Sequence, residues 1–120
     1  MQIKIPQDDY KYLWTRHVVQ KIFQYGITPN KIKRIVNNPL RKEEGIAPET
    51  VAVMQKISKK EEKGEIWVMY QNSGSKKRII STWIYPGITP KGKEIFVPDE
   101  VWIEIEKQKK EAKQESRSKG

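Results

Sequence analysis

The sequence predicts an α+β fold in which two N-terminal helices pack on a curved antiparallel sheet of three to four strands, followed by a C-terminal helix. Two observations support this class. Apolar residues follow a helical spacing before Pro39, whereas after Pro39 short runs of β-branched and aromatic residues alternate with turn-forming stretches. Helices followed by several strands are typical of domains whose helices cover one face of a sheet.

The first helix is expected at residues 16–25. Thr15 can accept a hydrogen bond from the first free amides of this helix, and Gly26 suits the left-handed residue that ends one. The apolar positions between them follow the helical repeat: Val18, Val19, Ile22 and Phe23. This helix should therefore bury one face.

A second helix should follow after a short turn. Thr28 repeats the N-cap signal, and Pro29 occupies the first helical position, where a backbone N–H is not needed. The apolar stripe contains Ile32, Ile35 and Val36. The helix should end near the sequence "NNP", because the residue before Pro39 disfavours helical dihedrals.

Three antiparallel strands are expected at residues 51–57, 65–71 and 77–84, separated by the turn compositions "SKKEEKG" and "NSGS". A further short strand is expected within "PLRKEEGI", residues 39–46. Strict alternation along the third strand sends Ile79, Ser81 and Trp83 to one face, and Arg78, Ile80, Thr82 and Ile84 to the other.

A loop rich in proline and glycine leads to the C-terminal helix, which should begin at Pro98 and be anchored by Val101, Trp102 and Ile105. Apolar residues nearly vanish beyond Glu106. We therefore expect residues 1–106 to form a single α+β domain and residues 107–120 to form a charged, frayed or disordered tail.

Composition excludes several classes of site. The chain has 120 residues, no cysteine and one histidine, which excludes disulfides and thiolate metal sites and argues against a histidine metal site. We expect no cofactor and no metal. No signal-peptide pattern and no run of ~20 apolar residues is present, so we expect a cytoplasmic protein without a membrane partner.

The net charge of +9 is concentrated in the body of the chain. Residues 99–120 hold six acids and six bases, so the surplus falls on residues 1–98, with eighteen Lys or Arg against nine acids. Such a body should attract polyanions, because each neutralised phosphate releases counterions. The alternative is a basic surface that only confers solubility.

Several stretches resemble a widespread set of uncharacterised small bacterial proteins: "WTRHVVQKIFQYGIT", "IKRIVNNP" and "KKRIISTW". These proteins look like distant relatives of RelE-type and barnase-like endoribonuclease toxins, which share two helices followed by an antiparallel sheet. The resemblance covers about residues 12–87. It implies RNA or the ribosome as a target and a protein partner such as an antitoxin. The C-terminal cluster of Tyr and Arg that those toxins carry is missing here.

Metal-independent RNA cleavage needs a base, an acid and cations that stabilise the charged phosphorane. His17 is the candidate base or acid, with Arg16 beside it in the first helical turn and Arg78 on the third strand. The positive end of the helix dipole should lower the pKa of His17 and keep its imidazole neutral. The alternative is an ordinary helix-start histidine bonded to a neighbouring group.

Candidate RNA-binding residues are cations and hydroxyls on the helices and on the third strand. They are Lys21, Lys33, Arg34, Lys76, Lys77, Ser81 and Thr82. Lys31, Arg41 and Lys42 extend this basic track. The alternative is a solvated helix face and a strand edge protected by charge. Trp67, Tyr70, Trp83 and Tyr85 have the chemistry to stack on bases, but aromatic residues in strands are more often core residues.

The sequence thus favours an RNA-binding protein with a toxin-like endoribonuclease fold, with cleavage as an open question. One alternative is a non-catalytic interaction protein or a ribosome-associated structural protein. Another is a plain structural domain whose basicity reflects a lysine-rich proteome. No P-loop, Rossmann fingerprint or nucleophile elbow is present, which argues against nucleotide-dependent enzymes and serine hydrolases. The oligomeric state is open.

Overall fold

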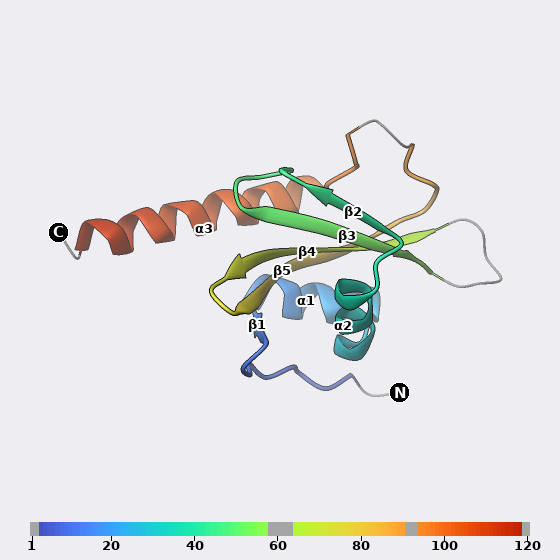
Figure 1. Ribbon diagram of the computed structural model, residues 1–120, viewed down its shortest axis with the longest axis horizontal. Coiled ribbons are helices and arrows are strands. Elements are labelled where there is room, and N and C mark those ends of the chain that lie inside the picture. Colours follow the sequence, from blue (N-terminus) through green and yellow to red (C-terminus); the bar gives the residue numbers. More distant parts are fainter. Residues whose placement is uncertain (1–2, 58–63, 91–93, 119–120) are drawn as a thin grey trace.

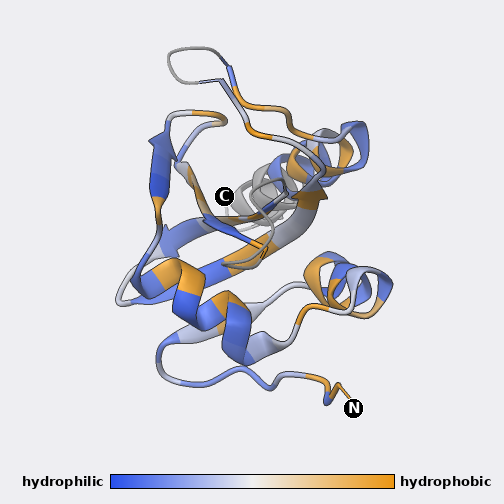
Figure 2. Ribbon diagram, turned by 90° about the vertical axis from the view of Figure 1, so that its right-hand side faces the viewer, coloured by the Kyte–Doolittle hydropathy of each residue, from blue (hydrophilic) through white to orange (hydrophobic). Residues whose placement is uncertain are grey.

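The computed structural model describes residues 3–57, 64–90 and 94–118. A five-stranded sheet carries two helices on one face and one helix on the other (Figure 1, Figure 2). The elements are β1 (Tyr12–Trp14), α1 (Arg16–Tyr25), α2 (Pro29–Asn37), β2 (Arg41–Glu44), β3 (Thr50–Lys56), β4 (Glu65–Ser73), β5 (Lys76–Tyr85) and α3 (Asp99–Ser118). The predicted α+β class is confirmed, and the sheet has one strand more than expected.

The strand order in the sheet is β1-β5-β4-β3-β2. Strands β2 to β5 form an antiparallel meander, whereas β1 runs parallel to β5 and pairs Tyr12 with Lys77. The strand expected within residues 39–46 exists as β2. Strand β1 was not predicted, because three residues are too few for a visible alternation.

Both N-terminal helices begin and end where the sequence predicts. The Thr15 and Thr28 hydroxyls accept hydrogen bonds from the third residue of each helix, and Gly26 ends α1 with a φ of 68°. The helices bury Val18, Ile22, Ile32 and Ile35 against Val53, Val68 and Ile79 of the sheet. Phe23, expected in the apolar stripe, is exposed instead.

The opposite face of the sheet has its own core. The rings of Trp67 and Trp83 stack with centroids 6.2 Å apart, and Val101 and Ile105 of α3 cover this cluster. These two residues anchor α3 as predicted. Trp102 does not, because 39% of it is exposed.

Strand β5 contains a β-bulge that strict alternation does not predict. Tyr70 of β4 pairs with Ile79, and the preceding residue Met69 pairs with Ser81, so Ile80 has no partner. Because of the extra residue, side chains of β5 that strict alternation places on one face lie on opposite faces before and after the bulge. Ile79 therefore lies in the core under α1 and α2, whereas Trp83 lies in the core under α3.

Helix α3 continues away from the sheet (Figure 1). It includes most of the charged segment 107–120, whose fraying stays a prediction. Within residues 3–57, 64–90 and 94–118, no helix combines the length and apolar character that a membrane span requires.

Candidate functional site

Thr15 ties the first turn of α1 to the bulge in β5. Its hydroxyl lies 2.9 Å from the carbonyl oxygen of Ile80 and 3.1 Å from that of Ile79, and it accepts a hydrogen bond from Val18. The Ile79 carbonyl also accepts the backbone N–H of Thr15 at 3.2 Å, so Thr15 contacts the bulged strand with its main chain as well as its side chain. One residue therefore caps the helix and fixes it beside Ser81.

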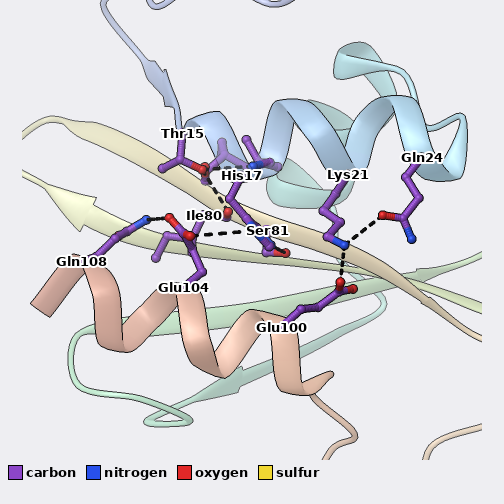
Figure 3. Close-up of polar contacts among 11 residues, drawn as sticks. Thr15, His17, Lys21, Gln24, Ile80, Ser81, Glu100, Glu104 and Gln108 are labelled. Carbon is purple, nitrogen blue, oxygen red and sulfur yellow. Dashed lines mark hydrogen bonds and ion pairs between the residues drawn. The ribbon is translucent and has the colours of Figure 1, made fainter.

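His17 lies where α1, β5 and α3 meet (Figure 3). Its Nε2 atom is 2.8 Å from Ser81 Oγ, and its Nδ1 atom is 3.9 Å from Glu104 Oε2. The tautomer with the proton on Nδ1 suits this environment, because the Ser81 hydroxyl then donates to Nε2 while the N–H faces the carboxylate. Only 10% of the His17 side chain is exposed.

One turn further along α1, a second contact joins the same helices. Lys21 is buried and donates hydrogen bonds to Glu100 of α3 and to Gln24 (Figure 3). The spacing is four residues on both helices, so His17 and Lys21 face Glu104 and Glu100 as two parallel rungs. Helix α3 is therefore held to α1 by polar contacts as well as by its apolar anchor.

Burial lowers the pKa of His17 below its ordinary value of 6.5. The Glu104 carboxylate opposes this shift, and the Lys21 ammonium adds to it. Desolvation disfavours the charged imidazolium, so the neutral ring predominates near pH 7. The predicted direction of the shift agrees, but the main cause is burial rather than the helix dipole.

The arrangement of Ser81, His17 and Glu104 is similar in order to the serine triads of acyl-transfer enzymes. Ser81 is fully buried, so a substrate cannot reach its hydroxyl. The same hydroxyl occupies His17 Nε2, the nitrogen that a general base would use. In this conformation the cluster serves to position α1 and α3 against the sheet.

The structure separates the three predicted catalytic residues. Arg16 is exposed in the first turn of α1, His17 points to Ser81, and Arg78 lines a groove beside α3. No hydrogen bond or ion pair joins these three side chains in the part of the chain that the structure describes.

Three of the predicted RNA-binding residues are not accessible. Lys21 is paired with Glu100, Ser81 is paired with His17, and the buried Thr82 hydroxyl donates to the Trp67 carbonyl at 2.7 Å. Sequence patterns gave no sign of this burial. The other four, Lys33, Arg34, Lys76 and Lys77, are exposed or half-buried.

A groove of about 380 Å³ runs between α2 and the end of β3. Three cations line it, Lys31 and Arg34 from the helix and Lys56 from the strand, together with the amide side chains of Asn38 and Gln55. None of the lining residues that the structure describes carries a carboxylate. None of the three cations takes part in an ion pair among the described residues.

More cations lie on the other side of α2, toward β1. Lys33 stands over the Tyr12 ring at 5.4 Å, and Lys77 stands over the Tyr70 ring at 5.3 Å. Lys11 is adjacent, since its carbonyl accepts the Lys77 amide. We call the following residues the α2 basic surface: Lys11, Lys31, Lys33, Arg34, Lys56 and Lys77.

Asp9 lies beside the β1 side of this surface. The pKa of Asp9 is lowered, first by hydrogen bonds from the backbone amides of Tyr12 and Lys11 and then by the positive charges of Lys33 and Lys11. Asp9 is therefore ionised and neutralises part of the charge on the β1 side. The groove between α2 and β3 has no acidic residue in the part of its lining that the structure describes.

Arg41 and Lys42 do not extend the basic track. Arg41 pairs with Glu43 at 2.7 Å and Lys42 with Glu44 at 3.2 Å. Both pairs form between alternate residues of β2, which project from the same side of a strand.

The aromatic candidates are core residues, as the alternative interpretation predicts. Trp67, Trp83 and Tyr70 are buried, and the half-buried Tyr85 packs against Phe96 with centroids 5.8 Å apart. The structure thus shows no free stacking platform among these four. In the described segments, no cluster of His, Asp and Glu side chains is arranged to hold a metal ion.

Sequence reasoning missed the contribution of α3. Glu100, Glu104 and Gln108 recur every four residues, each beside or near the buried anchors Val101 and Ile105. This spacing places all three on one stripe next to the apolar face. The sequence therefore indicates a polar stripe beside the buried face of this helix, but it does not indicate which element of the fold the stripe contacts.

Comparison of the chain with models of protein families, with curated proteins and with solved structures finds no significant match.

Proposed function

We propose that this protein binds RNA through the α2 basic surface. One observation carries the proposal: Lys31, Arg34 and Lys56 line a single groove, and none of the other described residues in its lining carries a carboxylate. Cations brought together from a helix and a strand repel each other in the absence of a ligand. A phosphate backbone relieves that repulsion and releases its own counterions.

RNA is the polyanion that the other observations favour. Two helices followed by an antiparallel meander agree with the resemblance to RelE-type and barnase-like endoribonuclease toxins. The side-chain amide of Asn38, beside the cations, suits hydrogen bonds to ribose hydroxyls and base edges. The Gln55 amide is already used, because it donates to the Asn38 carbonyl at 3.2 Å and accepts the Lys56 amide at 3.1 Å. Ribosomal RNA is included in this class, and an antitoxin-like protein partner remains a separate hypothesis.

The proposal is tested by the binding of a fluorescein-labelled oligouridine, measured by anisotropy at low salt. The Lys31→Gln, Arg34→Gln double variant should bind about tenfold more weakly or worse, because charged hydrogen bonds to phosphate are lost. The matched control is Lys42→Gln, which removes a cation that is already paired with Glu44. Unchanged affinity in the double variant, or an equal loss in the control, would refute the proposal.

Cleavage is a second function to test, because the resemblance implies it. The same mixtures, incubated without metal, are separated on a denaturing gel beside a His17→Ala, Arg78→Ala double variant. Products with 2′,3′-cyclic ends that this variant fails to make would establish an endoribonuclease. Intact RNA would leave binding as the function and His17 as a positioning residue.

A further inference from the structure

A second groove lies on the opposite face of the sheet, between α3 and the ends of β4 and β5. Its volume is about 290 Å³. Arg78 and Lys109 contribute positive charge, Ile80 and Ile105 contribute apolar walls, and Gln71 and Gln108 contribute amide groups. Apolar walls with a small number of polar and charged groups are the usual composition of a ligand site.

Irregular features of the chain converge on this groove. Ile80 is the unpaired residue of the bulge, and Glu49, also in the lining, has a positive φ of 64°. Gln108 donates to Glu104 at 3.3 Å and so connects the groove to the cluster around His17. Departures from regular geometry concentrate at functional sites, where the surrounding structure compensates their cost.

Among the described residues that line the groove, two cations, Arg78 and Lys109, stand against one acid, Glu49, so the groove has a small positive excess. Arg78 forms no ion pair within the described residues, and Lys109 has only a loose pair with Glu106 at 3.7 Å, with both partners exposed. The acid in the lining, Glu49, accepts a hydrogen bond from Gln71 at 3.4 Å. Arg78 and Lys109 reach the groove from a strand and a helix, so together they can contact one phosphate from two sides.

We infer that this groove binds one nucleotide of an RNA strand, with the phosphate between Arg78 and Lys109 and the base or ribose against Ile80 and Ile105. The volume of about 290 Å³ lies just below the range of about 300–1,000 Å³ that is usual for ligand pockets, so the groove has room for no more than a single nucleotide. The inference takes its ligand class, RNA, from the proposed function. The groove itself lies on the opposite face of the sheet from α2, and none of the described residues that line it also lines the groove beside α2.

The test is a titration of the ¹⁵N-labelled protein with uridine 5′-monophosphate, followed by NMR. Saturable shifts are expected at Arg78, Ile80 and Gln108. Arg78→Gln should weaken binding about tenfold, the scale of one hydrogen bond to a charged group. Lys110→Gln is the matched control, because Lys110 neighbours Lys109 on α3 but does not line the groove. Its affinity should equal that of the unaltered protein.

Three results would overturn the inference. They are the absence of shifts in the groove, equal affinity for uridine without phosphate, and equal affinity for inorganic phosphate alone. The Lys31→Gln, Arg34→Gln variant separates this inference from the proposed function. If that variant binds oligouridine normally while the titration succeeds, only the α2 proposal fails. If it loses oligouridine while the titration shows nothing, only the groove proposal fails.

Discussion

Thr15 performs two tasks that are usually divided between residues. Its hydroxyl caps α1 through the Val18 amide, and it donates to the carbonyl of Ile80, the residue that has no partner in β4. Losing the hydroxyl removes a cap and also leaves a partly buried carbonyl without its partner. The position of His17 therefore depends on the contacts of Thr15, two residues earlier, as well as on its own bond to Ser81.

Replacing Thr15 with alanine should lower the free energy of unfolding by about 1–2 kcal/mol, the upper part of the range for a lost N-cap. Urea denaturation of the purified variant measures this. Thr28→Ala is the control, since Thr28 caps α2 through Lys31 alone, and about 1 kcal/mol is expected there. Thr15→Ser should restore most of the loss. Equal losses for Thr15→Ala and Thr28→Ala would contradict the double role.

The second prediction at this scale concerns the pH dependence of stability. His17 has a lowered pKa in the folded protein, so below its ordinary pKa of about 6.5 the unfolded chain binds a proton that the folded chain resists. The stability that comes from the neutral imidazole is therefore complete above about pH 6.5 and declines as the pH falls toward the lowered value.

Between about pH 7.5 and about pH 5.5, the protein should lose more stability than a His17→Gln variant, which carries no titrating ring at this position. Urea denaturation at a series of pH values gives both curves. Parallel curves over this interval would show that protonation of His17 is not linked to unfolding.

At the scale of elements, the helices were predictable and the connections between elements were not. Two threonine caps and Gly26 fix the ends of α1 and α2 through local chemistry, which a sequence displays directly. The bulge at Ile80 depends on its partners Met69 and Tyr70, and isoleucine suits a regular strand equally well. For the same reason, the sequence did not indicate that Ser81 turns toward His17 and α3.

The candidate site shows the same limit. His17 and Ser81 were both singled out, and the structure brings them together, but Glu104 comes from a helix more than eighty residues away in the chain. The prediction that Lys21 and Thr82 bind RNA fails because both side chains are buried, and residue type indicates chemistry without indicating burial. Charge pattern located Lys33 and Arg34, which remain at the surface.

Two isoleucines of α3 provide a matched test of how this helix is attached. Ile105 is 5% exposed in the core under the helix, whereas Ile103 is 67% exposed on its outer side. Ile105→Ala should cost about 2–4 kcal/mol of stability, and Ile103→Ala should change it by less than about 0.5 kcal/mol. Urea denaturation of both variants decides this. Similar effects would mean that α3 does not pack in solution as described.

At the scale of the whole molecule, cations and acids are distributed unevenly over the surface. Six cations form the α2 basic surface, whereas those of β2 are paired with Glu43 and Glu44 in the same strand. None of the six cations of the α2 basic surface takes part in an ion pair among the described residues, so this part of the molecule presents a group of unpaired positive charges. A field of one sign on one face orients a polyanion before contact as well as holding it afterwards.

This distribution predicts how RNA binding responds to salt. For single-stranded nucleic acid, the logarithm of the binding constant falls with the logarithm of salt concentration by about 0.7 for each phosphate contact. If Lys31 and Arg34 each neutralise one phosphate, their double glutamine variant should show a slope shallower by about 1.4. Anisotropy titrations of oligouridine over a series of salt concentrations give the slope. Lys42→Gln should keep the slope of the unaltered protein, because Lys42 lies on β2 beside Glu44 and does not line the groove. A double variant that binds more weakly at every salt concentration with an unchanged slope would mean that these residues shape the groove without contacting phosphate.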